Sequence, residues 1–258
     1  MDDARSANVH DFRSTVNTVN LKKNGYEIVP MLDRKWNLMA ADDDLQRVEI
    51  QKYLTDLCQL VKEHLGARFV THFVSQVRPR CLRKADPDAI TPLKKFTVPR
   101  PHCDFTDRSM PKIWELLNFD DELERWQEGI DMVVNDPSGI SPRCQILGAW
   151  KPLQTVKRTP LCLVDPRTVP AEDWVRVPPA PKWAQNGGSW LLRHDKPGRS
   201  EHSWHYISDQ TPEELLLFVH EDTDPNAIGR VPHTALDIPG TEHLPDRQSV
   251  ETRLFVVY

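Results

Sequence analysis

Residues 143–150 read RCQILGAW, the first of seven short apolar runs that fill the second half of the chain. The six that follow are PLCLV (160–164), SWLLRH (189–194), HSWHYIS (202–208), ELLLFVHE (214–221), RVPHTALDI (230–238) and SVETRLFVVY (249–258). Runs of β-branched, aliphatic and aromatic residues separated by turn-forming residues are typical of β-strands. This density of short strands predicts a jelly roll or a related sandwich.

The first half of the chain is more helical. GYEIVPML (25–32) and ARFVTHFVSQV (67–77) read as strands, and residues 42–66 between them predict a helix. Three aspartates begin this segment, where the helix dipole favours negative charge, and Gly66 suits the position just past its end. Two shorter helices are predicted in MPKIWELL (110–117) and DDELERWQEGIDMVV (120–134).

Proline-rich segments mark the expected loops, namely residues 78–101 (RPRCLRKADPDAITPLKKFTVPRP) and 171–188 (AEDWVRVPPAPKWAQNGG). We expect a mainly β fold with flanking helices, a double-stranded β-helix of the jelly-roll, cupin-like type. Residues 1–258 would form one domain. Within it, residues 1–77 are a strand and helical flank, 78–101 a lid-like loop, and 102–258 the core that carries a metal site.

The composition narrows the class of partners. The 258 residues carry a formal net charge of −5, and the basic residues form no long block, so no nucleic-acid partner is expected. No apolar run approaches the length of a membrane span, and MDDARSANVHDF lacks the apolar core of a signal peptide. We expect a cytoplasmic protein without a membrane partner that acts on a small-molecule substrate. The sequence leaves homodimer formation and a partner enzyme both open.

HCDFTD (102–107) contains the strongest candidate for a metal site. Residues two apart in a strand point to the same side, so His102 and Asp104 could bind one ion. Two histidines and one carboxylate are the ligand set of non-haem Fe(II) oxygenases. A second His-x-Asp pair, His220 and Asp222, is an alternative, because either pair alone is weak evidence.

The rest of the C-terminal region favours the first pair. A jelly-roll iron site needs a later histidine, and His233 lies in a strand-like run. It also needs a basic residue for the far carboxylate of 2-oxoglutarate, which Arg247 in the sequence Arg-x-Ser with Ser249 would supply. The pair at 220 and 222 leaves only ten residues before His233, too few for the intervening strands.

Several blocks in the same order carry a more specific resemblance. They are HCDFT (102–106), AWKPL (149–153), LCLVDPRTV (161–169), WHYISDQTPEELLLF (204–218), PHTALDIPG (232–240) and RQSVETRLFVVY (247–258). This set resembles the fungal AsaB-type hydroxylase/desaturase family, which is similar to the bacterial cephamycin C-7 hydroxylase component. The family is placed among the Fe(II)/2-oxoglutarate-dependent oxygenases with a double-stranded β-helix core. The resemblance implies iron ligation by His102, Asp104 and His233, and 2-oxoglutarate binding by Arg247 with Ser249.

Some positions depart from the family pattern, and two arginines are candidates for the same role. The family usually has asparagine at the position of Gly148 and arginine at that of Lys151, and often glutamine or tyrosine near Phe105. Arg253 is a rival for the carboxylate clamp, because positions 247, 249, 251 and 253 share one face of a regular strand. That parity also turns Glu251 inward, where it must pair with one of the arginines.

Aromatic residues of these blocks are candidates for the substrate wall, although core packing is equally compatible with them. The candidates for substrate binding are Trp150, Lys151, Trp204 and Phe105, and Tyr206 is a further candidate for a co-substrate contact. His72, His202, His205 and His220 have no spacing that demands a role.

The function that follows is that of an oxidoreductase, a non-haem Fe(II)/2-oxoglutarate-dependent dioxygenase. It would use Fe(II), 2-oxoglutarate and O2 to hydroxylate, desaturate or cyclise a small secondary metabolite by C–H abstraction, releasing succinate and CO2. Two alternatives are an iron oxygenase that does not use 2-oxoglutarate and a non-catalytic jelly-roll subunit of a biosynthetic enzyme pair.

Overall fold

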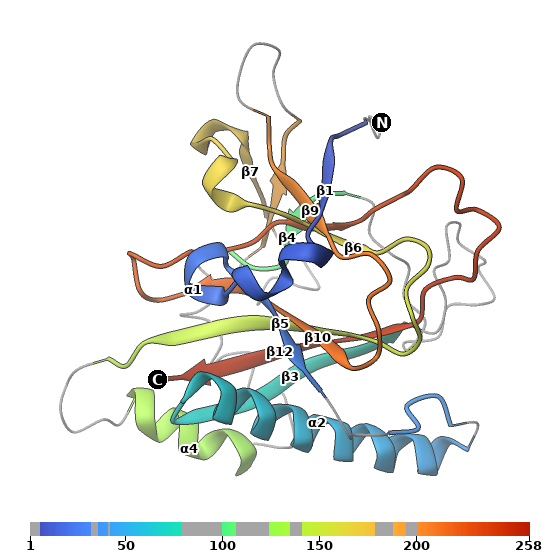
Figure 1. The fold of residues 1–258 in the computed structure, drawn as a ribbon. Coiled ribbons are helices and arrows are strands. Elements are labelled where there is room, and N and C mark those ends of the chain that lie inside the picture. Colours follow the sequence, from blue (N-terminus) through green and yellow to red (C-terminus); the bar gives the residue numbers. More distant parts are fainter. Residues whose placement is uncertain are drawn as a thin grey trace.

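Two β-sheets lie one above the other and account for most of the structure, a computed structural model (Figure 1). It describes residues 6–31, 36–40, 42–78, 100–106, 124–134, 141–178, 188–194 and 201–258. The seven-stranded sheet has the order β1-β9-β6-β11-β4-β8-β7, and the five-stranded sheet has the order β2-β10-β5-β12-β3. All neighbouring strands are antiparallel except β1 and β9, which are parallel.

The elements have the following bounds. The seven-stranded sheet contains β1 (Val9–Asp11), β4 (His102–Cys103), β6 (Leu161–Val164), β7 (Trp174–Val177), β8 (Ser189–Leu192), β9 (Trp204–Tyr206) and β11 (His233–Ala235). The five-stranded sheet contains β2 (Tyr26–Pro30), β3 (Phe69–Arg78), β5 (Cys144–Pro152), β10 (Glu214–Asp222) and β12 (Ser249–Val257). The α-helices are α1 (Leu21–Asn24), α2 (Asp43–Leu65) and α4 (Glu124–Val134), and the 3-10 helices are η1 (Arg13–Thr18), η4 (Pro166–Thr168) and η5 (Ala171–Asp173).

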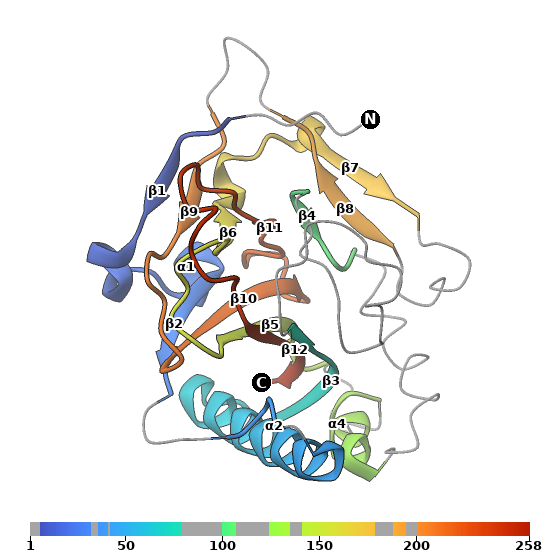
Figure 2. The same cartoon turned by 90° about the vertical axis from the view of Figure 1, so that its right-hand side faces the viewer.

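The mainly β architecture with flanking helices is therefore confirmed. Figure 2 shows the seven-stranded sheet above the five-stranded sheet, with α2 and α4 beneath the latter. Each of the seven apolar runs between residues 143 and 258 contains a strand. The two runs predicted as strands in the first half, residues 25–32 and 67–77, also contain one each. One expected loop is partly wrong, because residues 174–177 of the segment 171–188 pair with β8 as strand β7. The expected lid-like loop, apart from its ends, and the helix at 110–117 lie outside the described residues.

Helix α2 follows its sequence signals closely. Asp42 caps it by accepting a hydrogen bond from the backbone N–H of Leu45 at 2.8 Å, and Gly66 ends it in the left-handed conformation at φ +63°. Its buried side chains pack in the main hydrophobic core, with the side chains of β12 that point away from the other sheet. They are Tyr53, Leu54, Leu57 and Val61 on the helix, and Val250, Leu254 and Val256 on the strand.

Helix α4 closes a second, smaller core at the other end of β12. The Trp126 ring is completely buried, and its centre lies 5.9 Å from that of Phe73 and 5.7 Å from that of Phe255. Phe105, which comes one residue after Asp104, packs in the same cluster. The segment HCDFT is therefore anchored on its C-terminal side by aromatic packing. Among the described residues, no helix is both long and apolar enough to cross a membrane.

The contribution of α2 to stability can be measured with Leu57→Ala. Leu57 is fully buried, so its truncation leaves a cavity and should lower the free energy of unfolding by roughly 2–5 kcal/mol. Leu45→Ala on the exposed first turn of the same helix is the control and should change it by less than about 0.5 kcal/mol. Urea denaturation followed by circular dichroism measures both, and equal effects would contradict the packing described above.

Candidate metal centre

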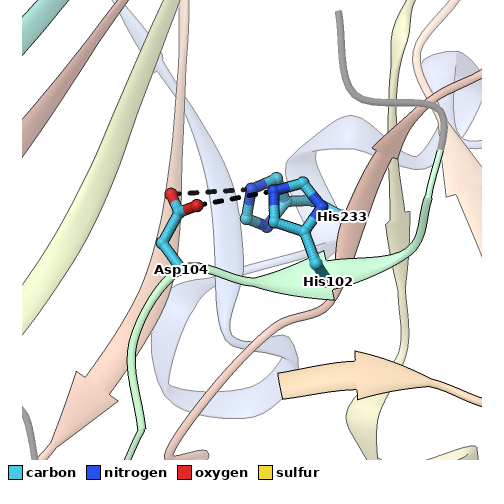
Figure 3. Close-up of side chains that lie close together, drawn as sticks. All are labelled: His102, Asp104 and His233. Carbon is cyan, nitrogen blue, oxygen red and sulfur yellow. Dashed lines mark ion pairs between the residues drawn. The ribbon is translucent and has the colours of Figure 1, made fainter. Parts of the chain in front are cut away.

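His102 and His233 lie directly opposite each other on neighbouring strands. Strand β11 pairs with β4 through the residue pair His233–His102, which brings the two ring centres to 4.5 Å. Asp104 follows two residues after His102 and turns its carboxylate toward both rings (Figure 3). The Oδ1 atom of Asp104 lies 3.4 Å from Nε2 of His102, and the Oδ2 atom lies 3.9 Å from Nε2 of His233.

Backbone carbonyl groups fix the tautomers of both rings. Nδ1 of His102 lies 2.7 Å from the carbonyl oxygen of Arg100, and Nδ1 of His233 lies 3.3 Å from that of Val231. A carbonyl oxygen only accepts hydrogen bonds, so each Nδ1 is the protonated nitrogen. When the rings are neutral, each Nε2 therefore presents a lone pair to Asp104, the orientation that metal-binding histidines have.

This arrangement fits a cation. Two nitrogen lone pairs and a carboxylate repel one another unless positive charge lies between them. Donors that each lie about 2.1 Å from one metal ion, at right angles, are about 3 Å apart, close to the distances within this cluster. The ligand atoms of His102, Asp104 and His233 all lie within 4.8 Å of one another. Two imidazoles and one carboxylate are the donor set that suits Fe(II) with open positions.

Arg253 pairs with the carboxylate of Asp104. Its Nε donates to Oδ2 at 3.2 Å and its Nη2 contacts the same oxygen, while Nη2 also lies 3.1 Å from Glu251. Although burial alone would raise it, the Arg253 guanidinium holds the pKa of Asp104 well below its ordinary value. The carboxylate is therefore ionised, with Oδ1 turned toward His102. The expected pairing of Glu251 with an arginine is confirmed.

His220 is a member of this cluster that the sequence did not identify. It lies on β10, its Nε2 is 3.7 Å from Oδ2 of Asp104, and its ring centre is 5.4 Å from that of His233. Burial lowers the pKa of His220 to about 3 and that of His233 to about 4, so both rings are neutral near pH 7. The signal available in the sequence was a histidine inside ELLLFVHE at the same strand parity as Leu216 and Phe218.

The alternative pair of His220 and Asp222 does not form a metal site. A register shift between Val219 and Glu221 interrupts the pairing of β10 with β5. Beyond it, the carboxylate of Asp222 accepts hydrogen bonds from Arg143 at 2.6 Å and from the side chain of Gln145 at 2.6 Å. This carboxylate is therefore engaged at the end of the strand.

Arg247 and Ser249 lie at the entry to β12. Both are buried, and the guanidinium of Arg247 lies 5.2 Å from the centre of the Trp150 ring. Its Nη1 donates to the carbonyl oxygen of Thr159 at 2.6 Å. The hydroxyl of Ser249 has no hydrogen-bond partner among the described residues. The structure thus places Trp150 beside the expected carboxylate clamp.

The other residues predicted to bind substrate or co-substrate differ in the face of the sheet on which they lie. Phe105 lies in the site, with its ring centre 5.3 Å from that of His220. Trp204 and Tyr206 pair with Val164 and Cys162, whereas His233 pairs with the intervening Leu163. Successive residues of a strand point to opposite faces, so Trp204 and Tyr206 point away from the metal cluster. The structure does not bring these two side chains into the site.

Lys151 also points away from the cluster. It pairs with Val250 on the face of the five-stranded sheet that packs against α2, and its ammonium group lies 5.8 Å from the centre of the Trp36 ring. The ammonium donates a hydrogen bond to the carbonyl oxygen of Pro212. The expected substrate contact by Lys151 is therefore wrong. Successive residues of a strand point to opposite faces, so Trp150 lies on the same face as Glu251, whereas Lys151 lies on the other face.

Two facing sheets with a His-Asp-His cluster between them define a class of jelly-roll proteins built to hold a catalytic metal. The chain belongs to the family described as "Oxidoreductase/YMDC permease-like domain" (YDMC), which matches residues 1–257.

Relatives across nearly the whole chain agree with the expected enzyme class. The chain is 27% identical over 263 residues to a protein named alpha-ketoglutarate-dependent dioxygenase phiK from a fungal species, covering 99% of this chain and 85% of the relative. It is 29% identical to hydroxylase/desaturase efuI of Hormonema carpetanum, and the match covers 97% of this chain and 82% of the relative. The resemblance to the hydroxylase/desaturase family is thereby confirmed.

A solved structure shows the same fold. The iron and alpha-ketoglutarate-dependent endoperoxidase NvfI superposes with a TM-score of 0.73, at 19% identity, covering 96% of this chain and 84% of that chain. The expected jelly-roll fold class is therefore confirmed.

The position of Lys151 generates a pH-dependent prediction. Burial lowers its pKa to about 8, whereas in the unfolded chain it is about 10.4. Between these values the unfolded state binds more protons, so folding stability rises with pH. The stability difference between the wild type and Lys151→Met should therefore shift in favour of the wild type by about 1 kcal/mol from pH 7 to pH 9.

Urea unfolding of the wild type and of Lys151→Met at pH 7 and at pH 9 measures this stability difference. Lys157→Met is the control, because Lys157 is exposed and pairs with Asp209 on the surface, so its difference should not change with pH. A difference for Lys151→Met that is the same at pH 7 and pH 9 would contradict the burial of the ammonium group.

Proposed function

We propose that this protein is an Fe(II)- and 2-oxoglutarate-dependent oxygenase with His102, Asp104 and His233 as its iron ligands. One observation carries the proposal: two Nε2 atoms of fixed tautomer and one ionised carboxylate lie within 4.8 Å of one another in a largely buried site. Such a donor set leaves positions open for a co-substrate and O2. The dioxygenase and hydroxylase/desaturase names of the relatives support the same chemistry.

The residues of the chain position this chemistry. When bound, the iron with 2-oxoglutarate and O2 supplies the oxidising power to remove a substrate hydrogen, with release of succinate and CO2. The carbonyl groups of Arg100 and Val231 keep the ligand rings oriented. Arg253 keeps Asp104 ionised and holds Oδ2, which leaves Oδ1 for the metal.

Arg247 with Ser249 is better suited than Arg253 to hold the far carboxylate of 2-oxoglutarate. The guanidinium of Arg253 is engaged by Asp104 and Glu251, immediately beside the proposed iron. Arg247 lies six residues earlier, at the entry to β12, where the buried Ser249 hydroxyl adds a donor. A planar guanidinium with a neighbouring hydroxyl suits a carboxylate.

The substrate is proposed to be a small secondary metabolite. Phe105 packs against His220 and Trp150 packs against Arg247, and apolar surfaces beside a few polar groups are typical of small-molecule sites. Hydroxylation, desaturation and cyclisation all begin with the same hydrogen abstraction, and all three products are compatible with this site.

Anaerobic titration with Fe(II) and then 2-oxoglutarate tests the proposal. The wild type should develop the visible metal-to-ligand charge-transfer band of the chelate. His233→Ala should lose the band and reduce turnover at least 100-fold, because one ligand to the metal is missing. His64→Ala, which removes an exposed histidine at the end of α2, should retain both.

Iron binding without the band would reject 2-oxoglutarate and favour an oxygenase that does not use it. No metal binding would reject the oxygenase and leave a non-catalytic subunit.

A second variant tests the carboxylate clamp. Arg247→Met should raise the dissociation constant of 2-oxoglutarate by about 10- to 100-fold, the loss expected for charge-assisted hydrogen bonds. Iron affinity should be unchanged, since Arg247 packs against Trp150 and Thr159 at the entry to β12. Arg158→Met, which removes a neighbouring ion pair with Asp246, is the control for indirect effects. Unchanged 2-oxoglutarate affinity in Arg247→Met would transfer the role to another residue.

A further inference from the structure

His220 is a buried polar group whose ring nitrogens form no hydrogen bond with the described residues. Its side chain is fully buried, and neither ring nitrogen forms a hydrogen bond within the part of the chain that the structure describes. The nearest carboxylate oxygen, Oδ2 of Asp104, is 3.7 Å away, which is too far for a hydrogen bond. An unpartnered buried group of this kind is destabilising and calls for an explanation.

The fold makes room for this ring at a specific place. Gly148 lies opposite Phe218 in the pairing of β5 with β10. A Cβ atom added at Gly148 would lie 2.8 Å from Nε2 of His220 and 2.4 Å from the Phe218 ring. Any other residue at this position would displace both rings. The missing side chain of Gly148 therefore allows the imidazole to lie between the sheet and Asp104.

Arg253 supplies a second unpartnered donor at the same point. Its Nε and Nη2 are engaged by Asp104 and Glu251, whereas the buried Nη1 has no partner among the described residues. Both His220 and Arg253 approach the same oxygen, Oδ2 of Asp104. An imidazole N–H and a guanidinium N–H thus remain available on two groups that both contact Oδ2 of Asp104, an atom of a proposed iron ligand.

The charge of the site indicates what these donors bind. With a divalent ion in place, one guanidinium and the carboxylates of Asp104 and Glu251 leave one excess positive charge in a largely buried space. An anionic oxygen compensates this charge and accepts both hydrogen bonds. The donors adjoin an atom of an iron ligand, so the anion that they reach lies in or beside the coordination sphere.

We propose that His220 and Nη1 of Arg253 bind the carboxylate of the 2-oxo-acid end of the co-substrate, the end beside the metal. This inference rests on the proposed function and adds a second anchoring point, separate from Arg247 and Ser249. His220 holds the near end of the co-substrate, while Arg247 holds the far end. The two anchors can be distinguished with a ligand that has only the near end.

The experiment compares 2-oxoglutarate with pyruvate, which has the oxo-acid end and no second carboxylate. Both are titrated anaerobically into the Fe(II) protein, with the charge-transfer band as the readout. His220→Leu should raise the dissociation constants of both ligands by the same factor, about 10-fold or more, and shift the band. Arg247→Met should affect 2-oxoglutarate alone.

Matched variants separate the hydrogen bond from the packing. His220→Gln retains an N–H donor and should keep both dissociation constants within a few-fold of the wild type. Phe218→Leu changes a neighbouring ring on the same strand without removing a donor, and it should change neither affinity by more than about threefold. If His220→Leu does not fold, His220→Met serves the same comparison.

Two outcomes overturn the inference. Unchanged affinities for both ligands in His220→Leu would show that the ring binds neither, and the proposed function would stand because the wild type still forms the band. Loss of iron binding in His220→Leu would make the ring a metal ligand instead. By contrast, a wild type that binds iron and forms no band with 2-oxoglutarate would remove the proposed function itself.

Discussion

The carboxylate of Asp104 lies among three histidine rings and the guanidinium of Arg253, with most of its side chain removed from solvent. Removing a carboxylate from water is costly unless a paired charge and hydrogen bonds compensate it. Arg253 provides the pairing on one side, and a metal ion would provide it on the other. The positions of strands β4, β11 and β12 are all constrained by this one group, because each contributes a residue that must reach it.

Strand β12 shows how a single element serves both the core and the site. Its odd-numbered residues from Ser249 to Arg253 face the other sheet and carry the polar groups. The alternate residues Val250 and Leu254 pack in the main core with α2. This alternation fixes the register, because a slip of one residue would bury Arg253 against the helix and turn Leu254 into the metal site.

The unpartnered donors connect the stability of the folded protein with its affinity for a ligand. His220 and Nη1 of Arg253 are buried without partners among the described residues, so the protein without ligands is less stable than its packing would allow. A ligand that satisfies both donors recovers this free energy on binding, and it stabilises the folded state more as its concentration rises above its dissociation constant. Stability and co-substrate affinity are thereby linked at one strand pair, β5 and β10, where Gly148 gives the imidazole its place.

Local patterns in the sequence determined much of this protein. Apolar alternation located the strands, and the aspartates and Gly66 set the ends of α2, because caps and strand periodicity depend on neighbouring residues alone. The order of His102, Asp104 and His233 identified the residues that the structure brings together. Tertiary structure decided which face of each strand is the inside. Lys151, Trp204 and Tyr206 point away from the site, because the pairing of distant strands sets that choice. It also placed His220 against Asp104, a contact between residues more than one hundred positions apart that no local pattern encodes.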